Sequence, residues 1–453
     1  MKASGTLTVS LTLLLGGLGA NVFAAQAQGD RYKLAAEYSE SHGGYSVLVM
    51  VDGEIVFERY ANGGGKEKAH GLASGTKSFV GVLAVAAVED GLLRLDDPAC
   101  ESLTEWKGDP LKSQITYRQL LTLTSGLMPG ERGEGGRNPA WKEIIAKPMS
   151  GQPGVQFEYG AYHLNAFGEA LERRLGKQAF EQYLDRRVLQ PSGITLEWRI
   201  RCPDGHPQLG GGAAMTAREW AQFGEFMRLG GVWHGKQIIA KELLAECLTG
   251  TPQNPAYGLT WWLKEPVPEE IIRQVPILQR DMGDMVTSDW LPDDLYMAAG
   301  AGKQRLYVIP SLRMVVVRQG DIRAGRSFRD AAFLDRLLRR RSDTSSGAAS
   351  RPSNPGTTAG PMASGMFSRL DANADGKVSK DEFKQLGELG QGRLKENPAV
   401  LDRLFQRLDA DGDGALSSEE MKSLGTLRDT PAGVTPKNNP SAKYNWTLLA
   451  SSF

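Results

Sequence analysis

Two twelve-residue stretches near the C-terminus repeat one pattern of oxygen-bearing side chains. Residues 371–382 read DANADGKVSKDE, and residues 409–420 read DADGDGALSSEE. In each stretch the first, third and fifth positions carry a carboxylate or an amide, the sixth is glycine, the eighth is apolar and the twelfth is glutamate. A hard cation needs six to eight oxygen ligands, the glycine permits a sharp turn, and the last glutamate can donate two oxygens. The two stretches therefore predict a pair of cation-binding loops.

This pattern resembles the EF-hand, and the resemblance implies which residues bind Ca²⁺. The implied ligands are Asp371, Asn373, Asp375, Lys377 and Glu382 in the first loop and Asp409, Asp411, Asp413, Ala415 and Glu420 in the second. The residue at the seventh position of each loop contributes only its backbone carbonyl. Phe367 and Phe405, each four positions before a loop, are expected on the entering helices. An acidic surface turn could explain one such loop, but two complete matches in tandem favour a calcium-binding pair.

The composition changes abruptly before these loops. Residues 342–365, SDTSSGAASRPSNPGTTAGPMASG, hold almost nothing that a core could bury, which is typical of a flexible linker. We therefore expect a small all-α EF-hand domain over residues 366–427. Residues 428–453 are expected to form a loosely ordered tail.

The N-terminus has the pattern of a secretory signal. An early Lys2 is followed by the apolar run LTLLLGGLGANVFAA and by small residues near Ala24 and Ala27. A membrane anchor is the alternative, but the apolar run is shorter than the ~20 residues that a spanning helix needs. We therefore expect a signal peptide over residues 1–27 and a periplasmic or secreted protein with no membrane span in its mature chain.

Charge and cysteine content exclude several classes of function. The chain has 53 basic and 53 acidic residues, so its net charge gives no reason to expect a nucleic-acid partner. Cys100, Cys202 and Cys247 are too few and too widely spaced for a disulfide framework or a zinc cluster, although an oxidising compartment could pair two of them. The five histidines have no metal-ligand spacing.

Strand patterns at both ends of residues 28–341 predict one α+β domain. Residues 45–60 alternate apolar and polar side chains around Asp52-Gly53, which indicates a β-hairpin. Residues 304–320 give two more strand-like runs around a Pro310-Ser311 turn. Helical and loop segments lie between them, so we expect a sheet that joins the two ends of the domain.

The stretch GLASGTKSFVG places Ser74 three residues before Lys77, at the start of an apolar helical run. Residues three apart share one face of a helix, so the Lys77 amine can lie beside Ser74 Oγ. A desolvated lysine loses its proton more easily and can then accept the serine proton. Serine and lysine are common, so the pair alone is a weak signal and its context decides.

That context resembles the serine β-lactamase-related family, which includes class C β-lactamases, penicillin-binding peptidases, and esterases or amidases of the same fold. The landmarks, between residues 45 and 320, are SGTKSFVGVLAVAAVEDGLLRLDDPA, ITYRQLLTLTSGL, FEYGAYHLNAFGEAL, GGAAMTAREWAQFG, YGLTWW and AAGAGKQRLYVIPSLRMVVV. The resemblance implies a β-lactamase-like antiparallel sheet flanked by a helical subdomain, with no cofactor at the site. It also implies Ser74 as the acylated nucleophile, Lys77 as its activating partner, and Tyr159, from the Y-x-N motif, as a third group in proton transfer.

The second motif departs from the family pattern. Ala161 stands where Y-x-N has asparagine, so an amide that would contact substrate is missing. Asn165 lies nearby in the sequence as a speculative replacement. Trp261 and Trp262 are candidates for a substrate cleft, although such pairs more often divide between core and surface.

The third motif departs as well. Lys-Thr-Gly or His-x-Gly is expected, but the chain has Gly300, Ala301 and Gly302, followed by a displaced Lys303. This removes the side chain that would hold a substrate carboxylate, which argues against an efficient β-lactamase. The backbone N–H groups of Ser74 and Lys303 could still form an oxyanion hole. A surface charge explains Lys303 equally well.

These observations favour an exported serine hydrolase that cleaves an ester or amide through an acyl-enzyme on Ser74. Its expected partners are a small ester, amide or peptide-like substrate and calcium at a separate module. A cell-wall D-alanyl peptidase or β-lactamase is the alternative that the altered motifs weaken. A non-catalytic, calcium-dependent binding protein is the alternative from another class, and the presence of Ser74, Lys77 and Tyr159 together argues against it.

Overall fold

The computed structural model describes residues 14–130, 138–339, 377–389 and 414–417, and the single residues 370, 405, 408, 409 and 420. The chain divides into two compact units, Met1–Ser342 and Asp343–Phe453, and each is described by itself. The predicted linker and tail lie outside the described residues. The domain boundaries stay predictions.

A six-stranded antiparallel sheet lies at the centre of the first unit, and an antiparallel sheet is what the sequence predicts. The strand order is β2 (Glu54–Tyr60), β1 (Gly44–Val51), β11 (Met314–Gly320), β10 (Gln304–Ile309), β9 (Tyr296–Gly300) and β8 (Trp262–Leu263). The two ends of the domain meet in the middle of this sheet, where Leu48 of β1 pairs with Val317 of β11. Both strands are almost wholly buried, which explains their continuous apolar runs.

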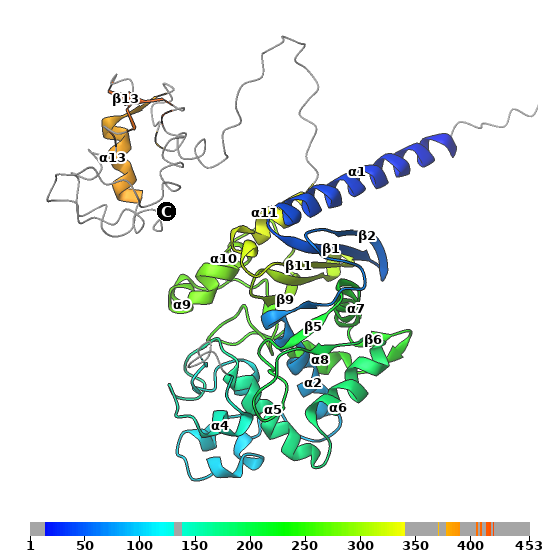
Figure 1. Cartoon of the computed structure of the whole chain (residues 1–453), viewed down its shortest axis with the longest axis vertical. Coiled ribbons are helices and arrows are strands. Elements are labelled where there is room, and N and C mark those ends of the chain that lie inside the picture. Colours follow the sequence, from blue (N-terminus) through cyan, green and yellow to red (C-terminus); the bar gives the residue numbers. More distant parts are fainter. Residues whose placement is uncertain are drawn as a thin grey trace, which may run out of the picture. The chain divides into compact units, whose positions relative to one another are not determined.

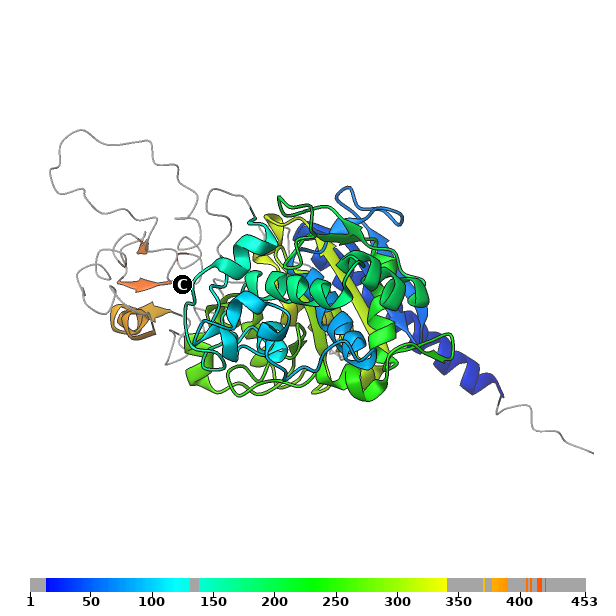
Figure 2. The ribbon, with the colours of Figure 1, turned by 90° about the horizontal axis from the view of Figure 1, so that it is seen from below.

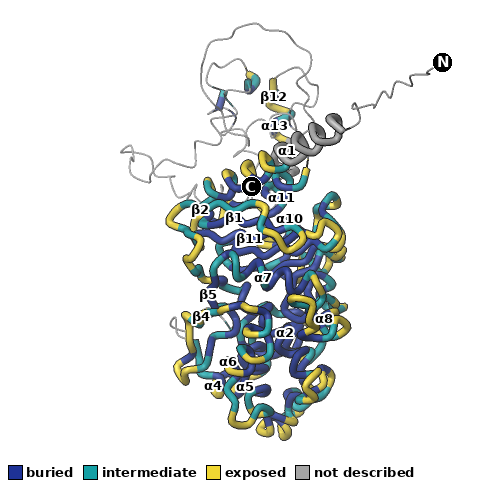
Figure 3. Tube along the Cα trace, turned by 90° about the vertical axis from the view of Figure 1, so that its right-hand side faces the viewer, coloured by how far each residue is buried: buried dark blue, intermediate teal, exposed yellow. Residues whose placement is uncertain are grey.

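Helices cover both faces of the sheet. α1 (Leu14–Ser41) and α11 (Asp330–Leu338) lie side by side on one face, and α7 (Ala217–Arg228) packs on the other (Figures 1 and 3). α7 begins where Thr216 accepts a hydrogen bond from the Glu219 backbone N–H and Glu219 returns one to Thr216. The central strands of the sheet are therefore buried between helices.

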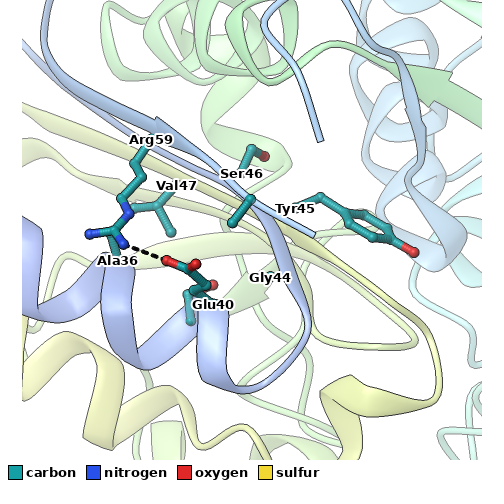
Figure 4. A pocket seen from close by; sticks show the side chains of 9 residues that line it. Ala36, Glu40, Gly44, Tyr45, Ser46, Val47 and Arg59 are labelled. Atoms are coloured by element: carbon teal, nitrogen blue, oxygen red, sulfur yellow. Dashed lines mark hydrogen bonds and ion pairs between the residues drawn. The ribbon is translucent and has the colours of Figure 1, made fainter. Parts of the chain in front are cut away.

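α1 is fastened to the edge of the sheet by charge. Arg59 of β2 pairs with Glu40 at 2.5 Å (Figure 4). It also pairs with Glu37 at 3.4 Å. α1 begins at Leu14 and so crosses the predicted cleavage sites; the signal peptide itself stays a prediction. Among the described residues, no helix combines the length and the hydropathy that a membrane crossing requires.

A helical subdomain lies beyond the second face of the sheet. The view from below shows its helices in front of the yellow strands (Figure 2). It is centred on α2 (Lys77–Glu89), which is buried from Lys77 to Ala87, and on α5 (Tyr162–Leu175). The remaining helices of the unit are α3 (Tyr117–Leu121), α4 (Trp141–Ala146), α6 (Phe180–Leu184), α8 (Lys241–Glu246), α9 (Glu269–Gln274) and α10 (Gly283–Val286). The short strands are β3 (His70–Gly71), β5 (Ala213–Met215) and β4 (Glu197–Trp198) in one sheet, and β6 (Val232–Trp233) and β7 (Lys236–Gln237) in another.

The second unit contains the pairing expected of tandem EF-hand loops. β12 (Val378–Ser379) and β13 (Ala415–Leu416) are antiparallel, and the apolar eighth residues of the two loops, Val378 and Leu416, face each other in register. α13 (Lys380–Leu389) follows the first loop. The rings of Phe383 and Phe405 meet edge to face at 5.5 Å, which gives this small unit an aromatic core.

Candidate active site

A tight turn presents Ser74 at the entrance of α2. The chain leaves β3, passes Ala73 and forms a short 3₁₀ turn over Ala73–Thr76. Ala73 has a φ of +46°, a left-handed conformation that a residue with a Cβ rarely adopts. Thr76 holds the turn, because its hydroxyl donates to the Ala73 carbonyl at 2.7 Å and accepts from the Ala213 N–H at 3.1 Å. The serine position is thus fixed by its neighbours.

Lys77 is the first residue of α2 and its amine meets the serine. Lys77 Nζ donates to Ser74 Oγ at 2.9 Å and to the Gly210 carbonyl at 2.5 Å. The side chain is only 3 % exposed, and no carboxylate in the described part of the chain forms an ion pair with it. Burial disfavours the ammonium form and lowers the pKa of Lys77 from 10.5 to about 7. The amine can therefore act as a base near neutral pH.

Tyr159 completes the group that the sequence predicts. Its ring centroid lies 4.9 Å from Lys77 Nζ. Burial raises the pKa of Tyr159 to about 12, while interactions with Ser74 and Trp262 act in the opposite direction. Trp261 and Trp262 are both buried, and the Trp262 ring packs 5.6 Å from that of Tyr159. The pair does not divide between core and surface, and Trp262 forms one wall around the tyrosine.

The missing asparagine of the second motif has a structural counterpart. Ala161 precedes α5, and a Cβ on Gly210 would lie 2.3 Å from the Ala161 Cβ, so the loop over residues 208–212 occupies that space. Asn165 does not replace the missing amide, because it is buried and accepts from the Leu209 N–H at 3.1 Å. It supports the loop whose Gly210 carbonyl meets Lys77. Gly210 is absent from the predicted site residues, and only the run of three glycines at 210–212 signalled a close approach.

The third motif packs directly against the serine turn. A Cβ on Gly300 would lie 2.1 Å from the Leu72 carbonyl oxygen and 3.1 Å from the Gly75 nitrogen, so only glycine fits at this end of β9. Gly302 follows in the hairpin turn, with a φ of +73°.

Lys303 is not a surface charge, which corrects one of the two interpretations of this residue. Its side chain is almost buried, and Nζ donates to Asp330 Oδ2 and to the Asp281 carbonyl, both at 2.8 Å. Its amine is therefore directed to these two partners. The proposed oxyanion role of the Ser74 and Lys303 N–H groups stays a prediction.

The described EF-hand residues fit a calcium ion. Asp409 Oδ2 accepts from the Gly414 N–H at 3.2 Å, while its Oδ1 is buried and has no hydrogen-bond partner. An unpartnered buried carboxylate oxygen is unfavourable without a cation. Glu382 and Glu420 occupy matching positions, each accepting at 2.8 Å from the hydroxyl of the serine three residues earlier. The other side-chain ligands of the prediction, Asp371, Asn373, Asp375, Asp411 and Asp413, lie outside the described residues.

Comparison with known families agrees with both parts of this arrangement. The β-lactamase family model matches residues 31–319, which is well over half of the chain. The chain belongs to the β-lactamase family. An EF-hand model matches residues 362–386 and 401–424.

Individual relatives of this β-lactamase family member are distant. Protein flp of Staphylococcus aureus strain COL is 25 % identical over 169 residues, which are 34 % of this chain and 34 % of flp. The chain thus spans about a third of that relative. A putative 6-aminohexanoate-dimer hydrolase from Bacillus anthracis superimposes with a TM-score of 0.53 at 17 % identity, covering 67 % of this chain and 79 % of that protein. A family VIII carboxylesterase gives a TM-score of 0.52 at 14 % identity, with 68 % and 96 % covered. These likenesses show the fold.

Proposed function

We propose that this protein is an exported serine hydrolase that cleaves a small ester or amide through an acyl-enzyme on Ser74. The observation that carries the proposal is the contact of Lys77 Nζ with Ser74 Oγ at 2.9 Å, made by a buried amine that forms no ion pair with any carboxylate of the described residues. Because burial brings the pKa of Lys77 to about 7, a large share of the amine is neutral at physiological pH. The family VIII carboxylesterase and the putative 6-aminohexanoate-dimer hydrolase have the same fold, which supports this reaction class.

The geometry supports a two-step acyl transfer. Ser74 Oγ attacks the substrate carbonyl carbon as its proton passes to Lys77 Nζ, and backbone N–H groups at the turn stabilise the oxyanion. The proton then moves, with Tyr159 as the adjacent hydroxyl, to the leaving oxygen or nitrogen, and the alcohol or amine departs. Water attacks the acyl carbon as its proton passes to the same amine. The amine then gives that proton to Ser74 Oγ as the C–Oγ bond breaks, which releases the acid and restores Ser74.

We propose that the part of the substrate that lies at the third motif carries no charge. Lys303, the cation nearest to that motif in the sequence, is bound by Asp330 and the Asp281 carbonyl. A substrate carboxylate would find no free lysine amine there. This favours neutral esters or amides over β-lactams and D-alanyl peptides, which carry such a carboxylate.

Calcium is proposed as the ligand of the second unit. Asp409, Glu382 and Glu420, with the donors assigned from the sequence, would supply oxygen ligands only, as a hard cation prefers. The ion would fix the two loops against each other and takes no part in the acyl transfer.

The test is steady-state hydrolysis of a short-chain p-nitrophenyl ester by the mature full-length protein. We expect Ser74→Ala to lose at least about a thousandfold in kcat/KM. Ser78→Ala is the matched control, because Ser78 lies on the same helix and its hydroxyl donates to the Thr260 carbonyl. Mass spectrometry should find the acyl group on Ser74.

Parallel assays with a chromogenic β-lactam and a D-alanyl dipeptide examine the alternatives. Higher kcat/KM on either of these than on the ester would replace the ester or amide proposal. Full activity in Ser74→Ala, or no turnover of any of the three substrates, would reject the hydrolase mechanism.

A further inference from the structure

The turn between β9 and β10 is held from behind by two buried arginines. Arg305 of β10 is 2 % exposed, and its Nη1 donates to the Gly300 carbonyl at 3.2 Å. Arg318 of β11 is fully buried, and its Nη1 donates to the carbonyls of Gly302 and Lys303 at 2.6 and 2.9 Å. Three of the four carbonyls in residues 300–303 thus accept from a guanidinium.

One carboxylate anchors this arrangement. Asp330, the first residue of α11, is completely buried and accepts from Arg305 Nε at 2.6 Å and Nη2 at 3.2 Å. It also accepts from Lys303 Nζ at 2.8 Å and from the Tyr307 hydroxyl at 2.6 Å. We name these four residues the Asp330 cluster: Lys303, Arg305, Tyr307 and Asp330. Within it, the side chains of Lys303 and Arg305 share the single carboxylate of Asp330. The cluster carries an excess of positive charge.

The cluster reaches the candidate active site through Gly300. Arg305 binds the Gly300 carbonyl, while Gly300 itself packs on the Leu72–Gly75 segment that carries Ser74. In a trans peptide the N–H points opposite to the carbonyl, so the Ala301 N–H points away from Arg305. A guanidinium on the carbonyl polarises that peptide and strengthens its N–H as a donor. The positive charge of Arg305 also acts on the Tyr159 hydroxyl and lowers the pKa of that group.

We propose that Arg305 is a positioning residue of this site, which holds Gly300 against the Ser74 turn and supplies from behind the strand the fixed positive charge that the third motif lacks. The inference rests on the proposed hydrolase function. The chain has no lysine or histidine at positions 300–302. Arg305, on the neighbouring strand, places a cation beneath the same segment.

The charges around these groups fix the sign of the expected effect. Two carboxylates act on Arg305: Asp330 of α11 and Asp281 from the segment Leu278–Met282. The other neighbouring polar groups are Tyr307 and Lys303 of its own hairpin and Arg318 of β11. Around Tyr159 stand Lys77, Ser74 and Trp262, and Asp281 acts on it against Arg305. Removing Arg305 leaves Asp281 and Asp330 in place, so the surroundings become more negative. Protonated Lys77 and protonated Tyr159 are then favoured.

The experiment measures kcat, KM and the pH profile of ester hydrolysis for the full-length protein and two variants. Arg305→Met removes the charge and the Gly300 contact. We expect kcat to fall about tenfold with little change in KM, since Gly300 is then held less firmly against the Ser74 turn and the nucleophile loses part of its fixed position. The acid limb of kcat/KM should move upward by roughly half a unit to one unit. Arg305→Lys keeps the charge, so its acid limb should stay in place while kcat falls a few-fold.

Arg228→Met is the control, because Arg228 forms an ion pair with Glu225 within α7 at 2.6 Å and its side chain is only 11 % exposed. Its pH profile should equal that of the wild type. If Arg305→Met does not fold, Arg305→Lys decides: a wild-type kcat in that variant overturns the positioning role. An unshifted acid limb in a folded Arg305→Met variant overturns the electrostatic role. The wild-type and Ser74→Ala assays run beside these variants, so failure of the hydrolase proposal is recognised separately.

Discussion

At the scale of single residues, Lys77 combines two properties that oppose each other. An amine buried without a carboxylate partner destabilises the folded chain whenever it is protonated. The same burial is what makes it a base near neutral pH. The site therefore gains reactivity where the fold loses stability, as is common for functional residues.

This opposition gives a pH-dependent prediction for Lys77→Met. The folded pKa of Lys77 is about 7 and its ordinary value is 10.5. Below pH 7 the folded state bears the full penalty of a buried ammonium, and the penalty disappears as pH rises toward 10.5. Lys77→Met should thus raise the free energy of unfolding by roughly 1–3 kcal/mol at pH 6, with a gain that shrinks toward pH 10, and should abolish ester hydrolysis.

Urea denaturation at pH 6, 8 and 10 measures the effect. A gain that is the same at all three pH values would contradict the assigned pKa of Lys77. A loss of stability at pH 6 would show that the unpaired Gly210 carbonyl outweighs the buried charge.

At the scale of elements, the fit between α5 and the loop over residues 208–212 decides the chemistry of the second motif. A Cβ on Gly210 would lie 2.3 Å from the Ala161 Cβ, so the loop packs closely against Ala161. The loop in return gives Lys77 its carbonyl partner. The small side chain of Ala161 thus leaves space for the loop that faces it.

We therefore expect Ala161→Asn to impair the protein, although it restores the family motif. The added amide would push the loop and its Gly210 carbonyl away from Lys77. Overpacking of this kind costs roughly 1–3 kcal/mol of stability, and kcat should fall because Lys77 loses a fixed position. Denaturant midpoints and ester kinetics test this, with Gly71→Ala as the control, since nothing lies within 4 Å of a Cβ at Gly71. Higher activity in Ala161→Asn would show that the site still accepts the family arrangement.

Most elements around the site were predictable from local patterns. The hairpin expected over residues 45–60 is β1 and β2, and the runs expected over 304–320 are β10 and β11, because strand alternation and turn residues are local signals. The helix after Ser74 begins at Lys77, since a 3₁₀ turn precedes it. That turn depends on contacts with Ala213 and Gly300, which local sequence does not show.

At the scale of the whole molecule, the proposed hydrolase site and the proposed calcium site lie in separate units. The predicted linker of 24 residues joins them and is flexible in composition. Calcium should therefore stabilise the second unit alone, by about 2.7 kcal/mol at a free concentration one hundred times the Kd. We expect kcat/KM for ester hydrolysis to be the same with calcium and with a chelator.

Calorimetry of the full chain tests this independence. Two unfolding transitions are expected, and calcium should raise the midpoint of the second unit's transition only. In the double variant Glu382→Gln and Glu420→Gln, that transition should no longer respond to calcium. A shift of the hydrolase transition with calcium, or a chelator effect on kcat/KM, would refute the independence of the two units.

The sequence by itself determined the family, the antiparallel sheet and the tandem loops, and it named Ser74, Lys77 and Tyr159 as candidates, because these features are carried by residue types at short spacings. Only the tertiary structure decided the lowered pKa of Lys77, the burial of Lys303 and the contacts of Arg305 with Gly300 and Asp330. Each of these depends on groups more than twenty residues away, such as Gly210 for Lys77 and Asp330 for Lys303 and Arg305. A pKa and an electric field are set by every charge and apolar surface within several ångströms, and the fold alone brings those together.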